Sequence, residues 1–104
     1  PYTTLFRSLE GLQNRLKSMA SKYAACVTQI TEAKDQELLD FCARRLVEMA
    51  AHIIMGHLMV QDASKSDLFS ESAQVYVRYA EAEVEKHINF IRKFDKDDLA
   101  YYRK

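Results

Sequence analysis

The sequence predicts an all-α fold: an antiparallel up-down-up bundle of three long helices followed by a short C-terminal helical turn. Three observations support this fold class. The 104 residues contain only two Gly and one Pro, too few turn residues for a β-sandwich or barrel. Apolar residues recur at alternating spacings of three and four along most of the chain. Hydrophobic residues make up 48% of the sequence, enough for one compact domain with a modest core.

The first helix is predicted from a heptad stripe of seven apolar positions: Leu9, Leu12, Leu16, Met19, Tyr23, Cys26 and Ile30. The preceding residues 1–8 (PYTTLFRS) lack an initiator Met and match the translation of a common sequencing adaptor, so we expect them to be non-native. The alternative is that Thr3 or Thr4 is a natural N-cap of this helix. We therefore expect residues 9–104 to form a single helical C-terminal domain, a piece of a longer protein.

The second helix is predicted from an equally regular stripe: Leu39, Cys42, Leu46, Met49, Ile53, Gly56, Val60 and Ala63. Gly56 is expected to let a neighbouring backbone approach closely. The step of nine residues from Ile30 to Leu39 loses the heptad phase, which predicts a turn within residues 31–36 instead of one continuous rod. Asp35 is the expected N-cap.

The third helix is predicted after a polar turn, residues 63–67 (ASKSD), in which Ser66 or Asp67 can cap it. Its apolar face comprises Phe69, Ala73, Tyr76, Ala80, Val84, His87, Ile91 and Phe94, widened by Val77 and Ile88 for packing against two neighbours. Short connections make sequential helices antiparallel neighbours.

Three acidic residues, Asp95, Asp97 and Asp98, predict the start of the terminal helical turn, residues 98–102. The alternative architecture is an incomplete four-helix bundle. In that case a helix or domain upstream covers the remaining apolar surface, including Tyr101 and Tyr102.

Composition argues against several classes of function. Fifteen basic and fifteen acidic residues cancel, so no net field attracts the chain to nucleic acid. The longest apolar run, residues 53–60, is interrupted by Gly56 and His57 and falls short of the roughly 20 residues of a membrane span. No secretory signal is visible at the N-terminus, and we expect a cytoplasmic location.

Two groups of residues could in principle hold a metal. Counting outward from the turns places Cys26 level with Cys42, and Cys42 within about one turn of His87. Zinc would need a fourth ligand, and no CxxC or HxxxH pair is present. We interpret these three residues as core filling, with both thiols reduced, because packed helix axes lie too far apart for a disulfide.

Two Glu-x-x-x-His pairs, Glu48 with His52 and Glu83 with His87, resemble carboxylate-bridged metal motifs with one residue too many. We interpret them as ordinary i to i+4 surface pairs.

Nucleophilic catalysis has no support in the sequence. Four serines at the second turn, Ser64, Ser66, Ser70 and Ser72, have no His at matched spacing and are better explained as capping residues. A run of charges, Glu81, Glu83, Glu85 and Lys86, is expected to form a solvated face, near which Arg78, Arg92 and Lys93 could contact another domain.

The second half of the chain resembles a known domain. Residues 49–63 (MAAHIIMGHLMVQDA) and 74–100 (QVYVRYAEAEVEKHINFIRKFDKDDLA) are similar to the extra helical domain that follows the catalytic core in one bacterial type of acyl-CoA dehydrogenase. The resemblance implies a parent flavoenzyme, dependent on FAD, that oxidises acyl-CoA thioesters to enoyl-CoA in fatty acid metabolism. In that family the catalytic glutamate and the flavin and CoA contacts belong to core domains upstream. The resemblance therefore assigns no catalytic, cofactor-binding or metal-binding residue, and no cofactor, to this chain.

The role implied by the resemblance is interdomain or subunit packing. The expected partners are the upstream acyl-CoA dehydrogenase core domains and further copies of the chain in a homo-oligomer. The alternative is a stand-alone helical-bundle module that oligomerises through its stripes and has no enzymatic activity. A domain of a larger enzyme should expose an apolar strip, whereas a module should be a monomer or defined oligomer that behaves well alone.

Overall fold

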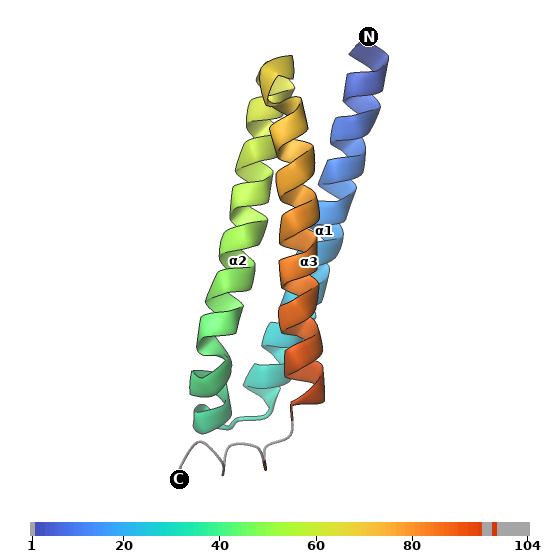
Figure 1. Ribbon diagram of the computed structural model, residues 1–104. Helices are drawn as coiled ribbons and strands as arrows, with labels where there is room; N and C mark the ends of the chain where they lie inside the picture. The colour runs from blue at the N-terminus through green and yellow to red at the C-terminus, as the bar shows by residue number, and fades with distance from the viewer. Residues whose placement is uncertain (1, 95–96, 98–104) are drawn as a thin grey trace.

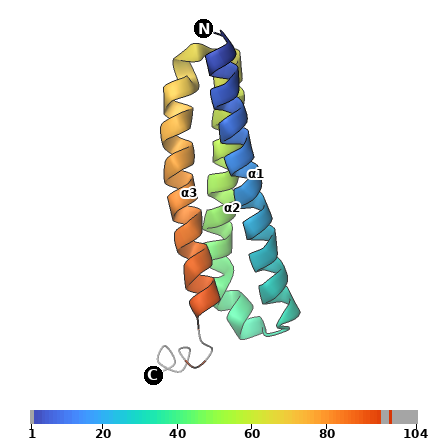
Figure 2. The same ribbon diagram turned by 90° about the vertical axis from the view of Figure 1, so that its right-hand side faces the viewer.

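The computed structural model describes residues 2–94 and residue 97. Helix α1 (Tyr2–Glu32) is followed by α2 (Gln36–Lys65), the short 3-10 turn η1 (Asp67–Phe69) and α3 (Ser70–Lys93). The three helices run down, up and down, and each packs against both others (Figures 1 and 2). The predicted all-α bundle with up-down-up topology is confirmed. The predicted terminal turn, residues 98–102, lies outside the described residues.

Helix α1 begins seven residues before the first position of its stripe. Its backbone is helical from Tyr2, so Thr3 and Thr4 lie inside the first turn and not at an N-cap position. The non-native origin of residues 1–8 stays a prediction.

The α1–α2 turn forms where the break in heptad phase predicted it. Lys34 adopts a left-handed backbone conformation (φ 51°), and its N–H donates to the carbonyl of Thr31 at 3.2 Å. The Asp35 carboxylate then accepts hydrogen bonds from the backbone N–H groups of Glu37 and Leu38, at 3.1 and 3.3 Å. Asp35 is therefore the N-cap of α2, as predicted, because its carboxylate satisfies two N–H groups that have no partner inside the helix.

The α2–α3 turn is shorter than predicted. Helix α2 continues to Lys65, and Ala63 is fully buried within it. The prediction that Ser66 or Asp67 caps the third helix is wrong. The Ser66 N–H donates to the carbonyl of Asp62 at 3.2 Å, and its hydroxyl accepts from the Leu68 N–H at 3.3 Å, so Ser66 caps η1. Phe69 occupies the N-cap position of α3 and makes no side-chain cap. Phe69, predicted as the first core position of the third helix, is 47% exposed. That prediction is wrong because the tighter 3-10 winding of η1 rotates Phe69 away from the face that α3 buries.

The three predicted stripes meet in one hydrophobic core. In the first two stripes and in the central part of the third, the predicted positions are buried, with three exceptions. Tyr23, Leu39 and Tyr76 lie partly exposed at the edge of the core. Leu16, Met49 and Ile88 supply the largest fully buried side chains, one from each helix. Burial of a Leu, Ile or Met side chain contributes roughly 1.5–3 kcal/mol, so the meeting of these stripes is the main force that holds the bundle together.

Gly56 is buried in this core, but its neighbour differs from the expected one. The three atoms nearest to an added Cβ all belong to the Leu16 side chain, the closest at 2.6 Å. Gly56 therefore makes room for a side chain of α1 and not for its backbone.

None of the helices in the described part of the chain is long and apolar enough to cross a bilayer.

Candidate functional site

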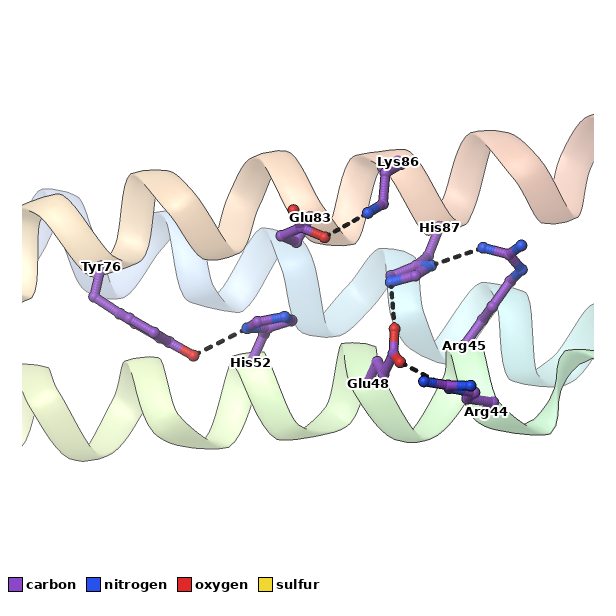
Figure 3. A network of polar contacts seen from close by, with 8 residues as sticks. All are labelled: Arg44, Arg45, Glu48, His52, Tyr76, Glu83, Lys86 and His87. Carbon is purple, nitrogen blue, oxygen red and sulfur yellow. Dashed lines mark hydrogen bonds and ion pairs between the residues drawn. The ribbon is translucent and has the colours of Figure 1, made fainter.

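A row of polar side chains follows the contact between α2 and α3, with α1 behind it (Figure 3). Helix α2 contributes Arg44, Arg45, Glu48 and His52, and α3 contributes Tyr76, Glu83, Lys86 and His87. Most of these positions flank the buried stripes, so the side chains can bury their stems while their polar ends reach a partner or solvent. Tyr76 and His87 belong to the stripe of α3 itself.

His87 lies at the centre of this row and is only 3% exposed. The guanidinium Nη1 of Arg45 lies 3.3 Å from its Nδ1. An arginine can only donate, so Nδ1 is the acceptor and the ring proton of the neutral imidazole resides on Nε2. Burial lowers the pKa of His87, while the nearby Glu48 carboxylate opposes this effect. The imidazole is therefore neutral at pH 7.

The Glu48 carboxylate approaches His87 from α2, with Oε2 3.0 Å from Nε2. The Nε2 atom nevertheless has no aligned hydrogen-bond acceptor. Both observations hold if the carboxylate lies within electrostatic range but off the direction of the N–H bond. We therefore regard the contact as an electrostatic pairing across the helices and not as a strong hydrogen bond.

Neither predicted i to i+4 pair forms a hydrogen bond or ion pair among the described residues, although Glu83 lies near enough to His87 to raise its pKa. Glu48 contacts His87 of α3 and the Nε of Arg44, at 3.2 Å, and Glu83 contacts Lys86 at 2.8 Å. The hydrogen bond from Lys86 lowers the pKa of Glu83 and raises that of Lys86. The contacts with Arg44 and Lys86 lie within one helix, at spacings of four and three. The contact between Glu48 and His87 forms because antiparallel packing brings the flanks of α2 and α3 together, which spacing within one helix does not reveal.

His52 likewise pairs across the helices. Its Nδ1 lies 3.0 Å from the Tyr76 hydroxyl, and the edge of its ring meets Tyr79, with centroids 5.5 Å apart. Burial raises the pKa of Tyr76, so its hydroxyl stays protonated and can donate this hydrogen bond. Sequence reasoning did not identify Arg45, and it placed Tyr76 on the apolar stripe of the third helix without a polar role.

Both cysteines are buried and free. Burial raises the pKa of the Cys26 and Cys42 thiols more than the nearby Arg92 and Arg45, respectively, lower it, and the proximity of Cys26 raises the pKa of Cys42 further. Raised thiol pKa values and lack of access make these groups poor nucleophiles. Among the described residues, no group of three His, Cys, Asp or Glu side chains could hold a metal ion.

The serines of the second turn make local hydrogen bonds. The Ser64 hydroxyl donates to the Gln61 carbonyl at 2.6 Å, and the Ser70 hydroxyl accepts from the Gln74 amide at 3.4 Å. Neither contact is an N-cap, so among these three serines the capping interpretation is confirmed for Ser66 alone, which caps η1. The charged run of α3 is only partly a solvated face, because Glu85 forms an ion pair with Lys22 of α1.

Aromatic side chains close one end of the α2–α3 contact. Phe41 packs against Phe94 with ring centroids 4.8 Å apart, and Phe90 adjoins both. The Arg45 guanidinium lies 3.6 Å from the centre of the Phe90 ring. This cation–π contact and the hydrogen bond to His87 hold Arg45 in a defined position.

An apolar groove occupies the other end of the contact. It encloses about 660 Å³ and is lined by Met59, Leu68, Glu71, Ser72, Val75, Tyr76 and Tyr79. Leu68 is 80% exposed, and more than half of the surface of Val75 and Tyr79 is exposed. Sequence reasoning missed this groove, although Leu68, Ser72, Val75 and Tyr79 keep helical spacing beside the buried face of α3.

The groove is suited to apolar contact and not to a flavin dinucleotide. FAD carries an anionic pyrophosphate, which proteins bind through backbone N–H groups at a helix N-terminus, often in a glycine-rich loop, or through cations. The one charged side chain that lines the groove is acidic Glu71, and the two glycines of the chain lie inside helices. The residues described here do not fit FAD.

Comparisons with known proteins agree with the resemblance seen in the sequence. Residues 3–99 match the family described as acyl-CoA dehydrogenase C terminal. The chain is also similar to a solved structure, the acyl-CoA dehydrogenase family protein from Porphyromonas gingivalis, with 47% sequence identity and a TM-score of 0.80 over 84% of this chain and 75% of that chain. Among curated proteins, none matches this chain. The match over nearly the whole length shows that the chain belongs to the acyl-CoA dehydrogenase C-terminal domain family.

Proposed function

We propose that this domain serves an FAD-dependent acyl-CoA dehydrogenase as a packing element, and that the chemistry takes place in other domains of that enzyme. The parent reaction is the α,β-dehydrogenation of an acyl-CoA, in which FAD supplies the hydride acceptor. The apolar groove at the end of the α2–α3 contact carries this proposal. Its exposed Leu68, Val75 and Tyr79 form the kind of surface that soluble proteins usually cover with a partner.

The polar row supports the same division of labour. His87, the buried histidine that could act as a base, is only 3% exposed. Its neighbours Arg45 and Glu48 hold it between α2 and α3, where it links the two helices. We infer that this row stabilises the bundle and orients its outer surface, while acyl-CoA and FAD bind to the upstream domains.

We also propose a cytoplasmic location. Two free thiols buried in one core are typical of proteins that fold in a reducing compartment. The parent enzyme would therefore belong to intracellular acyl-CoA metabolism.

The alternative function is a stand-alone helical interaction module. The closed core favours it, because each of the three helices packs against both others without a further domain. In that case the same apolar groove would bind an unrelated protein.

The reading frame upstream of this chain separates the two proposals. A flavin-dependent dehydrogenase core in the same frame supports the accessory domain, whereas a native start codon shortly before Leu9 would overturn it. A second test uses the full-length enzyme. Leu68→Glu should lower its melting temperature or separate the core from the helical domain, because a charge would then be desolvated in the interface.

Gln29→Glu is the matched control, since it introduces the same carboxylate at an exposed position of α1. Equal effects of Leu68→Glu and Gln29→Glu would contradict a role for the groove in domain packing. Purified chain without the core should not oxidise acyl-CoA in the presence of FAD and an electron acceptor. Turnover by the chain alone would contradict the placement of the active site in other domains.

A further inference from the structure

The outer face of α2 carries an apolar strip that the three-helix core does not use. The strip comprises Val47, Ala51, Ile54, Met55 and Leu58, all exposed. At about 100° per residue these positions lie on the opposite side of the helix from Cys42, Met49 and the rest of the buried stripe. Because the buried stripe of α2 faces α1 and α3, the strip faces away from both helices.

Charged residues flank the strip at both ends of the same face. Asp40 and Arg44 precede it, and Asp62 and Lys65 follow it, and all four are exposed. The order of charges is therefore acidic, basic, apolar strip, acidic, basic. A helix that packs against itself in the antiparallel direction would bring each charge to one of opposite sign.

The spacing of these residues is symmetric about a point between His52 and Ile53. Residues equidistant from that point, to within one position, form four pairs across a two-fold axis: Asp40 with Lys65, Arg44 with Asp62, Val47 with Leu58, and Ala51 with Ile54. Two pairs join opposite charges and two join apolar side chains. The small Ala51 side chain near the axis would let two helices approach closely. Parallel packing would instead place like charges side by side.

We propose that a second copy of this chain docks on the outer face of α2, antiparallel to it and related by a two-fold axis near His52 and Ile53. Such an isologous contact uses the same surface twice, so each of the two charge pairs occurs twice and the dimer contains four charge contacts. The contact would extend from Asp40 to Lys65, roughly 38 Å at 1.5 Å per residue. Charge complementarity sets the direction and register of the helices, and the apolar strip supplies most of the affinity.

Arg44 is available for this contact although it already pairs with Glu48. Its side chain is 90% exposed, and an exposed i to i+4 pair contributes only about 0.3–0.5 kcal/mol. The guanidinium can therefore reorient towards Asp62 of the second copy, or bridge both carboxylates, at little cost. A single helix pair buries less surface than the roughly 1,600 Å² of a standard interface, so we expect a dissociation constant in the micromolar range.

The proposed dimer surface shares no residue with the apolar groove. One face of the domain could thus contact the enzyme core while the other contacts a second subunit. The dimer proposal does not rest on the accessory role: a monomeric chain would overturn the dimer and leave the family membership and the upstream reading-frame test unaffected.

Sedimentation equilibrium of the purified chain, over a concentration range from micromolar to several hundred micromolar, tests the proposal. The wild-type chain should dimerise. Ile54→Glu should weaken dimerisation at least 100-fold, because it places two carboxylates near the axis. Val75→Glu, at a similarly exposed apolar position in the groove, is the control and should leave the dissociation constant within about threefold. Circular dichroism should show that both variants stay helical.

A charge exchange tests the direction of packing. Arg44→Asp and Asp62→Arg should each weaken the dimer about tenfold, and the double variant should recover to within about threefold of wild type. The two positions lie 18 residues apart on one helix, roughly 27 Å, so recovery must come from contacts between copies. A monomer at all concentrations, a dimer insensitive to Ile54→Glu but sensitive to Val75→Glu, or a double variant no better than the single variants would each overturn the proposal.

Discussion

The two glycines of this chain allow the same substitution to be made in opposite surroundings. Gly11 lies in α1 with no atom within 4 Å of an added Cβ, whereas a Cβ at Gly56 would lie 2.6 Å from Cδ2 of Leu16. Both glycines lie inside helices and neither has a positive φ. Replacing either by Ala should therefore bring the same gain in helix propensity, about 0.8–1 kcal/mol.

At Gly56 this gain is opposed by crowding. Carbon atoms pack best about 3.5–4.0 Å apart, so Cδ2 of Leu16 would have to move by roughly 1 Å. Leu16 is fully buried among close-packed side chains, and overpacking of this kind costs about 1–3 kcal/mol. We expect Gly56→Ala to lower the free energy of unfolding by about 0–2 kcal/mol, the difference between this cost and the helix gain. Gly11→Ala, where no atom opposes the helix gain, should raise it by about 0.8–1 kcal/mol.

Urea denaturation followed by circular dichroism at 222 nm measures both effects. The slope of the free energy against urea concentration should not change, since the same surface is exposed on unfolding. A third variant isolates the contact: in a Leu16→Ala background, Gly56→Ala should become stabilising because the crowded methyl group has gone. If Gly56→Ala stabilises the native background as much as Gly11→Ala does, Leu16 is not packed against Gly56 as described and the reasoning is refuted.

Three further predictions concern the first turn and the buried histidine. Asp35→Ala should lower the free energy of unfolding by about 1 kcal/mol, since two backbone N–H groups lose their acceptor. Thermal melts should show a melting temperature lower by about 4–8 °C, and an unchanged melting temperature would contradict the role of Asp35 as a cap. Lys34→Gly should raise stability by about 0.5–1 kcal/mol by relieving the left-handed backbone, whereas Lys34→Ala, which keeps the Cβ, should not. Because burial lowers the pKa of His87 below its unfolded value of about 6.5, the unfolded chain binds a proton first as the pH falls, so stability should decrease from pH 7 to 5. In urea titrations His87→Gln should show a smaller decrease over this range, and an equal decrease would contradict the assignment.

The α2–α3 contact shows why some residues of the candidate site could not be predicted. The stripe correctly placed His87 among buried positions, but its contacts with Arg45 and Glu48 depend on the rotation of α2 about its axis and on its axial offset from α3. Periodicity within one helix does not determine either quantity. The expected pairing of Glu48 with His52 therefore failed, although both residues were identified.

Phe69 and Gly56 illustrate the same limit within the core. Apolar spacing assigned Phe69 to the buried face, but a short 3-10 turn changes the angle per residue and exposes it. Glycine in a stripe indicated a close approach, yet which atom of the neighbour approaches depends on how α1 settles against α2.

The sequence by itself determined that this protein is a three-helix bundle with turns near Asp35 and Ser66, because helix periodicity, loss of phase and capping are local properties of the chain. The sequence also determined the family, because residues 49–63 and 74–100 resemble the acyl-CoA dehydrogenase C-terminal domain in their particular side chains and not only in apolar spacing. Only the tertiary structure decided which polar groups meet between α2 and α3 and which apolar surfaces remain exposed. Burial is a property of the assembled bundle, since a side chain loses solvent only when another helix covers it.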